Sequence, residues 1–181
     1  PDQLPHIGKV KDGNARHAAS VHVLEADAEI IPARHRRQHR RAPQAHQPDL
    51  LDPDLQRQAV WRGGAAAAGL PEGQHGLHLH AVGSCEAPGF TSAGAHLNPG
   101  GHQHGSANPQ GSHLGDLPNL VIDSTGAGTL TAELKATRAE AEAALFDADG
   151  SAIVIHAAPD DYRTDPTGNS GARIACGLFT R

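Results

Sequence analysis

The histidines in the second half of the chain are the residues whose types and spacing most directly suggest chemistry. The 181 residues include fourteen histidines, and eight of them follow residue 74. His78 and His80 form a His-x-His pair inside residues 76–81, which alternate as a β-strand does. Side chains two positions apart point to the same face of a strand, so both imidazoles can reach one metal ion. The pair alone is weak evidence, because such pairs also arise by chance in histidine-rich chains.

A second set of metal-binding residue types lies in residues 96–116. It consists of four histidines and one aspartate: His96, His102, His104, His113 and Asp116. His113 and Asp116 are three residues apart around Gly115, a spacing that suits two ligands from one turn. Three imidazoles and one carboxylate would complete a tetrahedral zinc site with no open position, as in structural zinc sites.

Copper becomes a candidate when His156 is added to these histidines. Four imidazole nitrogens, from His78, His80, His96 and His156, suit Cu(II) in a tetragonal field. The chain contains no methionine, which argues against a blue-copper site. Taken alone, a histidine at the end of an apolar strand is more often a hydrogen-bonded core residue, so only the whole group favours a metal at His156.

Six stretches of the sequence carry a more specific signal: GQHGLHLH at 73–80, SAGAHLNP at 92–99, His104-Gly105, HLGDLPNL at 113–120, VIH at 154–156 and GNSGARIACG at 168–177. Together they resemble the copper/zinc superoxide dismutases of bacterial type. They occur over about 105 residues in the family's order and with its gaps. The resemblance is therefore specific, although it leaves the first third of the chain uncovered.

The resemblance implies a role for each residue of the histidine group. His78, His80, His96 and His156 would bind copper, and His96 would also bridge to zinc, whose other ligands would be His104, His113 and Asp116. His102 is the rival of His104; we prefer His104 because it lies eight residues after the bridging histidine and precedes a glycine, as in the family. Asp160 matches a carboxylate that links a copper histidine and a zinc histidine, and His75 matches a histidine that supports the site without binding metal.

The resemblance also implies the reaction and its remaining residues. The chain would dismute superoxide to dioxygen and hydrogen peroxide at a copper centre that cycles between Cu(II) and Cu(I), with a zinc ion bridged through His96. Arg173 matches the family arginine beside copper, whose permanent charge can orient the anion; the alternative is a surface salt bridge. Cys85 and Cys176 match the family's disulfide, with two reduced thiols as the alternative.

A disulfide would place the protein in an oxidising compartment, so we expect a periplasmic or other extracytoplasmic location, although no signal peptide is visible in the chain. Bacterial relatives include both dimers and monomers, so a homodimer is one of two expected states. No apolar run approaches 18 residues, and we therefore expect no membrane span.

The elements that must position these residues are short strands joined by long loops. We expect strands near 75–82, 119–123, 128–134, 151–156 and 173–179, and two long loops at 83–119 and 157–171. Residues 137–145 could form a short helix or an exposed loop. Loops of this length inside a domain are usually functional or disordered, and their histidines favour function. These elements, with the resemblance, predict an all-β, immunoglobulin-like Greek-key sandwich or barrel with two long functional loops.

Residues 1–62 differ from the rest, so we divide the chain into an atypical segment, 1–62, and a superoxide dismutase-like domain, 63–181. The first segment has 10 Lys and Arg against 8 Asp and Glu, and the second has 5 against 12. The acidic domain argues against nucleic acid as a partner. Apart from a strand near 19–24, residues 1–62 lack strand patterning. Two explanations stay open: a divergent, partly disordered extension, or a segment read in the wrong frame.

Two other functions compete with the active enzyme. One is a copper- and zinc-binding domain without catalysis, such as a metal store; the retained ligands and Arg173 speak against it. The other is a damaged product that binds zinc over residues 96–116 but cannot form its sheet.

Overall fold

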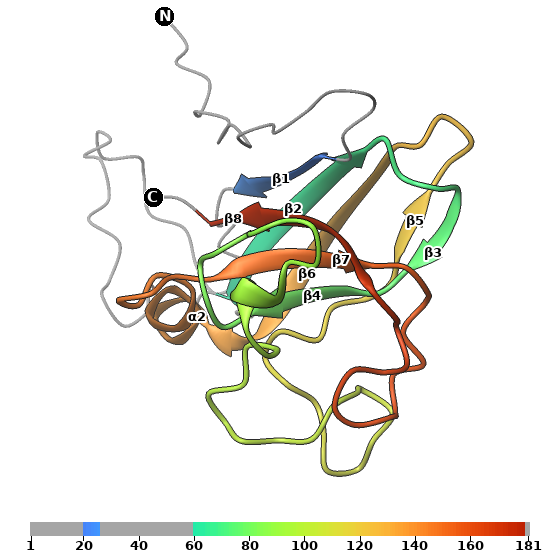
Figure 1. The fold of residues 1–181 in the computed structure, drawn as a ribbon. Helices are drawn as coiled ribbons and strands as arrows, with labels where there is room; N and C mark the ends of the chain where they lie inside the picture. The colour runs from blue at the N-terminus through green and yellow to red at the C-terminus, as the bar shows by residue number, and fades with distance from the viewer. Residues whose placement is uncertain (1–19, 26–59, 180–181) are drawn as a thin grey trace, which may run out of the picture.

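A computed structural model describes residues 20–25 and 60–179 of the chain (Figure 1). The structured elements are mostly strands, as the sequence predicts. The strands are β1 (Ser20–Glu25), β2 (Val60–Ala68), β3 (Gly73–His75), β4 (Leu77–His80), β5 (Leu120–Ile122), β6 (Gly128–Thr137), β7 (Ala152–His156) and β8 (Arg173–Leu178). They are joined by a 3-10 turn at Thr91–Ala93 and one helix, α2 (Arg138–Leu145), within the described ranges.

The strands form antiparallel sheets that pack as a sandwich. One sheet has the order β1-β2-β6, a second consists of β3 and β5, and the third has the order β4-β7-β8. In Figure 1 the third sheet lies across β2 and β6. The sheets do not close into a barrel, which decides between the sandwich and the barrel that the sequence left open. The core between the sheets is aliphatic and includes Leu77, Leu79, Leu120, Ile122, Leu134, Leu145, Ile153 and Ile155.

Strand β4 shows how the sequence pattern separates core from site. Its residues alternate between leucine and histidine, and all four are buried. Leu77 and Leu79 pack in the core, so His78 and His80 point to the opposite face. β4 pairs with β7, whose five residues are all buried. A continuous apolar run is expected for such a central strand, since both of its faces are covered.

The two long loops predicted at 83–119 and 157–171 are confirmed, and both are hydrogen-bonded to the sheet that carries the histidines. The first loop pairs with the free edge of β4: Leu79 donates to the Gly115 carbonyl at 2.9 Å, and Leu97 donates to the Leu79 carbonyl at 2.8 Å. In the second loop, Gly76 donates to the carbonyl of Ala158 at 2.9 Å. The loops therefore have fixed positions on the sheet.

Residues 138–145 form a helix with Thr137 as its N-cap, which resolves the choice between helix and exposed loop. A capping box starts it: the Thr137 side chain accepts from the Glu140 amide, while the Glu140 carboxylate accepts from the Thr137 amide at 2.9 Å. Ala141 and Leu145 are buried on its inner face. No helix in the described ranges is long and apolar enough to cross a membrane.

The structure differs from the predicted strand at 75–82, because Gly76 divides it into β3 and β4. The two parts pair with different partners, β5 and β7. At Gly76 the chain passes against the second loop, and a Cβ atom there would lie only 2.8 Å from the Ser170 Cβ. The alternation of the sequence continues across this glycine, so the pattern alone does not reveal the division.

The strand predicted near 19–24 is confirmed as β1, which pairs with β2. No strand is predicted over 60–68, yet β2 lies there and is the central strand of its sheet. β1 and the start of β2 thus fall within the segment 1–62. The remainder of that segment lies outside the described residues, and the division of the chain at residue 62 stays a prediction.

Candidate metal centre

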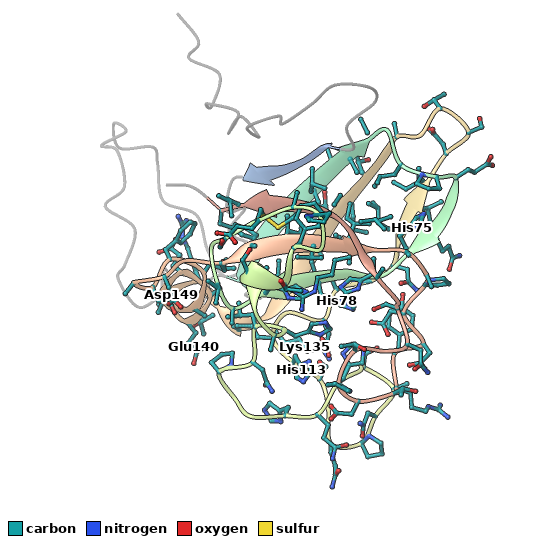
Figure 2. The ribbon with its side chains drawn as sticks, in the orientation of Figure 1. His75, His78, His113, Lys135, Glu140 and Asp149 are labelled. Carbon is teal, nitrogen blue, oxygen red and sulfur yellow. A yellow bond between two sulfur atoms is a disulfide. The ribbon has the colours of Figure 1, made fainter. Side chains whose placement is uncertain are left out.

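The four histidines predicted to bind copper lie together below the sheet. His78 and His80 come from β4, His156 from the end of β7, and His96 from the first long loop. All four side chains are buried, and one ring nitrogen of each lies within 4.8 Å of the others. Figure 2 shows His78 in this position beneath β4, with His113 beyond it toward the first loop.

Each of these rings is oriented by a hydrogen bond from one nitrogen. His80 and His156 donate through Nδ1 to the carbonyls of Gly94, at 2.9 Å, and Gly171, at 3.1 Å. His78 donates through Nε2 to Asp160 at 2.8 Å. A neutral imidazole that donates from one nitrogen has a lone pair on the other.

The remaining nitrogens converge on a common space. His78 Nδ1, His80 Nε2, His96 Nε2 and His156 Nε2 are buried and have no hydrogen-bond partner among the described residues. Buried polar atoms normally have partners, because leaving them unpaired costs free energy. Four unpaired nitrogens that face one another are the donor set expected for copper, so the residues present fit that metal.

A second donor set surrounds Asp116. Its Oδ1 lies 3.0–3.1 Å from the Nδ1 atoms of His96, His104 and His113, and the Nδ1 atoms of His96 and His113 are 3.4 Å apart. Ligand atoms on a tetrahedral zinc with bonds of ~2.0 Å would be separated by ~3.3 Å, so this spacing fits zinc. Asp116 Oδ2 accepts from the amides of Gly105 and His113, which leaves Oδ1 for the metal.

One ring nitrogen of His78 also lies within 4.8 Å of donor atoms of His96, His104 and Asp116. His113 Nδ1 lies closer to this carboxylate, at 3.0 Å from Asp116 Oδ1, and therefore belongs to the second donor set. The free nitrogen of His78 belongs to the first set. His102 is exposed, and its backbone groups bond to the side chain of Asn98, so the structure separates it from His104.

Asp160 connects the two donor sets. Its Oδ2 accepts from His78 at 2.8 Å and its Oδ1 from His104 Nε2 at 3.0 Å, and the side chain is fully buried. The side chain of Asn119 holds the backbone of Asp160 through two hydrogen bonds. Its Nδ2 donates to the Asp160 carbonyl, and its Oδ1 accepts from the Asp160 backbone amide. No pattern in the sequence points to this role for Asn119, although the residue lies in the histidine-containing stretch 113–120.

Arg173 is held by backbone carbonyls rather than by a carboxylate. Its Nη1 and Nη2 donate to Phe90 and Gly94, both at 2.7 Å, and it is the register partner of His156. Gly94 therefore accepts from both Arg173 and His80. These contacts place the guanidinium beside the first donor set and disfavour the surface salt bridge.

The cysteines form a disulfide, which rules out the alternative of two reduced thiols. Cys176 lies on β8, and Cys85 lies on the loop that supplies the carbonyls for Arg173. The bond thus joins the strand of Arg173 to the loop that holds it.

His75 bonds to the carbonyls of His156 and Pro71, and Figure 2 shows it on β3, away from the donor sets, in a supporting position.

Burial and charge set the protonation of the metal-free site. Burial lowers the pKa of His80 to about 2, and burial lowers the pKa values of His96 and His156 to about 4. Burial also opposes the charged form of His104, but Asp116 and Asp160 outweigh it and raise its pKa to about 9. Their hydrogen bonds to histidine hold the pKa values of Asp116 and Asp160 below their usual range, despite burial.

The metal-free chain should therefore be most stable near pH 6.5. Below this value His80, His96 and His156 become protonated in the unfolded chain but stay neutral in the folded chain. Between pH 6.5 and its own folded pKa, each of these histidines therefore lowers the free energy of unfolding by ~1.4 kcal/mol for each pH unit of acidification. His104 acts in the opposite sense, since its contribution declines as pH rises from 6.5 through about 9. Urea unfolding of the metal-free chain at pH 4.5, 6.5 and 9.5 measures this; equal midpoints at pH 4.5 and 6.5 would contradict it.

Comparison with known proteins identifies the family. A family model described as copper/zinc superoxide dismutase matches residues 55–179. The chain belongs to the copper/zinc superoxide dismutase family. Members of this family use copper and zinc, and their substrate is superoxide. In this chain the two histidine-rich donor sets could hold one metal ion each.

Named superoxide dismutases are among the most similar relatives. Superoxide dismutase (Cu-Zn) 2 of Aquifex aeolicus is 44% identical over 117 residues, which cover 62% of this chain and 68% of that protein. The superoxide dismutase (Cu-Zn) of Caulobacter vibrioides is 46% identical over 115 residues, covering 61% and 66%. The match thus spans about two thirds of these relatives.

A solved structure of a superoxide dismutase-like protein from Bacillus subtilis shares the fold. That protein is a double mutant in which two residues are changed to histidine. It is 39% identical to this chain, with a TM-score of 0.62, and the match covers 68% of this chain and 87% of that one. The agreement supports the β-sandwich with copper/zinc superoxide dismutase architecture.

Proposed function

We propose that this chain dismutes superoxide, with copper held by His78, His80, His96 and His156 and zinc held by His96, His104, His113 and Asp116. The observation that carries the proposal is the convergence of four buried, unpaired imidazole nitrogens beside a second donor set around Asp116. Bound copper would supply one-electron chemistry between Cu(II) and Cu(I), and bound zinc would hold its ligands in place.

His96 faces both donor sets and is the residue that we assign to proton handling. Its Nδ1 points to Asp116, and its Nε2 points to the other imidazoles. Burial keeps this ring neutral near pH 7, because its pKa falls to about 4. With Nδ1 held on the zinc side, Nε2 is the nitrogen of this ring that could take up a proton from water, and the low pKa would favour its release to peroxide as peroxide forms.

Arg173 is assigned to capture and orient superoxide. Burial lowers its pKa, but a guanidinium remains charged at neutral pH. Its fixed position beside His156 would put a positive charge next to the first donor set.

Replacing Arg173 with alanine should lower kcat/KM about 10- to 100-fold, because a hydrogen bond to a charged group contributes about 1.5–3 kcal/mol. Copper and zinc content should stay unchanged. Arg173→Lys should restore part of the rate, since it keeps the charge without the planar fork. Arg163→Ala is the matched control, because Arg163 is an exposed cation in the second loop. Equal loss in both alanine variants would argue against a specific role for Arg173.

The direct test is metal content together with activity of the purified chain. We expect one copper and one zinc per chain and removal of superoxide that cyanide inhibits. A chain that is loaded with both metals but inactive would overturn the enzymatic proposal.

The second candidate function is copper and zinc binding without catalysis. A relative in Bacillus subtilis, 45% identical over 111 residues, carries the name superoxide dismutase-like protein, so the family includes proteins not named as enzymes. This chain has all four histidines and an arginine held beside them, which favours catalysis. The activity of the metal-loaded chain separates the two candidates.

We also propose an extracytoplasmic, periplasmic location, because the Cys85–Cys176 disulfide requires oxidising conditions to form and persist. Fractionation of cells, with thiol labelling before and after reduction, tests this. Light scattering of the purified chain would distinguish the two expected oligomeric states, a monomer and a homodimer.

A further inference from the structure

The carboxylate of Asp160 lies between the two donor sets, and its position depends on the surrounding contacts. Oδ1 accepts from His104 at 3.0 Å and from the Tyr162 amide at 2.7 Å, while Oδ2 accepts from His78 at 2.8 Å. With its backbone held by Asn119, the residue is bonded at both ends. It therefore has little freedom to shift without losing a contact to one of the two histidines.

Gly168 packs directly against this carboxylate. A Cβ atom at position 168 would overlap Asp160 Oδ1 and would lie 2.6 Å from both Asp160 Cγ and His104 Nε2. The Gly168 backbone cannot easily move away, since its amide donates to Thr164 at 2.6 Å and its carbonyl accepts from Asp161 at 3.0 Å. The space that a side chain would need is the space in which Asp160 and His104 meet.

We propose that Gly168 is a positioning residue for the metal centre: the absence of a side chain there allows Asp160 to bond His78 and His104 together. This inference rests on the proposed ligand sets. A methyl group at 168 would displace the carboxylate from His104 Nε2, and His104 would lose the hydrogen bond that directs its Nδ1 toward Asp116. Partners of this kind typically change metal affinity 10- to 100-fold when they are lost.

Gly150 provides a matched control outside the metal centre. Both glycines have a positive φ, +63° at Gly168 and +67° at Gly150, so alanine is strained at either position. A Cβ at Gly150 would meet its nearest atom, the Gly83 Cα, at 3.7 Å, an ordinary contact. The difference between Gly168→Ala and Gly150→Ala therefore isolates the overlap with Asp160 and His104 from the backbone strain.

The experiment measures zinc affinity of the full chain by competition with a chromophoric chelator, and the visible spectrum of Co²⁺ bound in place of zinc. We expect Gly168→Ala to weaken zinc binding about 10- to 100-fold and to alter the cobalt spectrum. Gly150→Ala should stay within about threefold of the unmodified chain. Equal zinc affinity in the two variants would overturn the proposal.

A double-mutant cycle tests whether the effect acts through Asp160. Asp160→Ala removes the carboxylate and leaves only the close contact with the His104 ring, so adding Gly168→Ala should then cost less zinc affinity than it does in the unmodified chain; an equal cost in both backgrounds would overturn the proposed route. If Gly168→Ala does not fold, the same overlap predicts that Asp160→Ala restores folding in the double variant. Failure of the unmodified chain to bind zinc would instead refute the proposed function.

Discussion

Replacing His156 with alanine should abolish copper binding and leave zinc in place. His156 contributes one of the four unpaired nitrogens, and it makes no contact with Asp116. We expect copper affinity and dismutation to fall by more than about 100-fold, beyond the range seen for residues that only support a ligand. Metal analysis after dialysis, with the activity assay, measures both effects. The bond from His75 goes to the backbone carbonyl of residue 156, so this part of the fold should survive.

His102→Ala is the matched control for this substitution. His102 is also an imidazole near the centre in sequence, but it is exposed and lies outside both donor sets. It should keep both metals and full activity. Loss of zinc from His156→Ala, or retention of copper, would show that the two sets are not arranged as we assign them.

Removing the disulfide should cause the largest loss of stability. Cys85 and Cys176 are 91 residues apart, and closing a loop of that length stabilises a fold by about 4–5 kcal/mol in the chain-entropy model. The double substitution Cys85→Ser and Cys176→Ser should therefore lower the Tm by roughly 10–20 °C, as calorimetry of the metal-free chain would measure.

The same variant should also lower activity beyond its effect on stability. Cys85 anchors the loop whose carbonyls at Phe90 and Gly94 hold Arg173. At a temperature where the variant is folded and carries both metals, we expect a reduced kcat/KM. Ser84→Ala leaves the disulfide in place and serves as the control. An unchanged Tm in the double variant would indicate that packing of β8, rather than the crosslink, holds this end of the sheet.

Local patterns were sufficient to predict the strand that carries His78 and His80, the strand that ends at His156, and the two long loops. The leucine–histidine alternation at 77–80 places both imidazoles on one face, because the side-chain period of a strand is two. The apolar run before His156 predicts a buried strand, and the glycine-rich histidine stretches predict functional loops. In these cases the deciding interactions lie within a few residues of one another.

Strand β2 was not predicted, and its composition explains why. Its sequence is VWRGGAAAA, and alanine and glycine have low strand propensity. The strand forms because it pairs on both sides, with β1 and β6, where small residues allow close packing. The division between β3 and β4 at Gly76 could not be predicted either, because it depends on the contact of Gly76 with the second loop.

The residue types that two metals need can be read from the amino-acid sequence: the imidazoles, the carboxylates and the arginine, together with two cysteines. The packing of the fold is needed to show which nitrogen of each ring is free, that His102 lies outside the centre, and that Asp160 joins His78 to His104 against Gly168. Those outcomes depend on contacts between residues that are tens of positions apart. No short-range periodicity encodes such contacts, so they follow from how the sheets and loops pack.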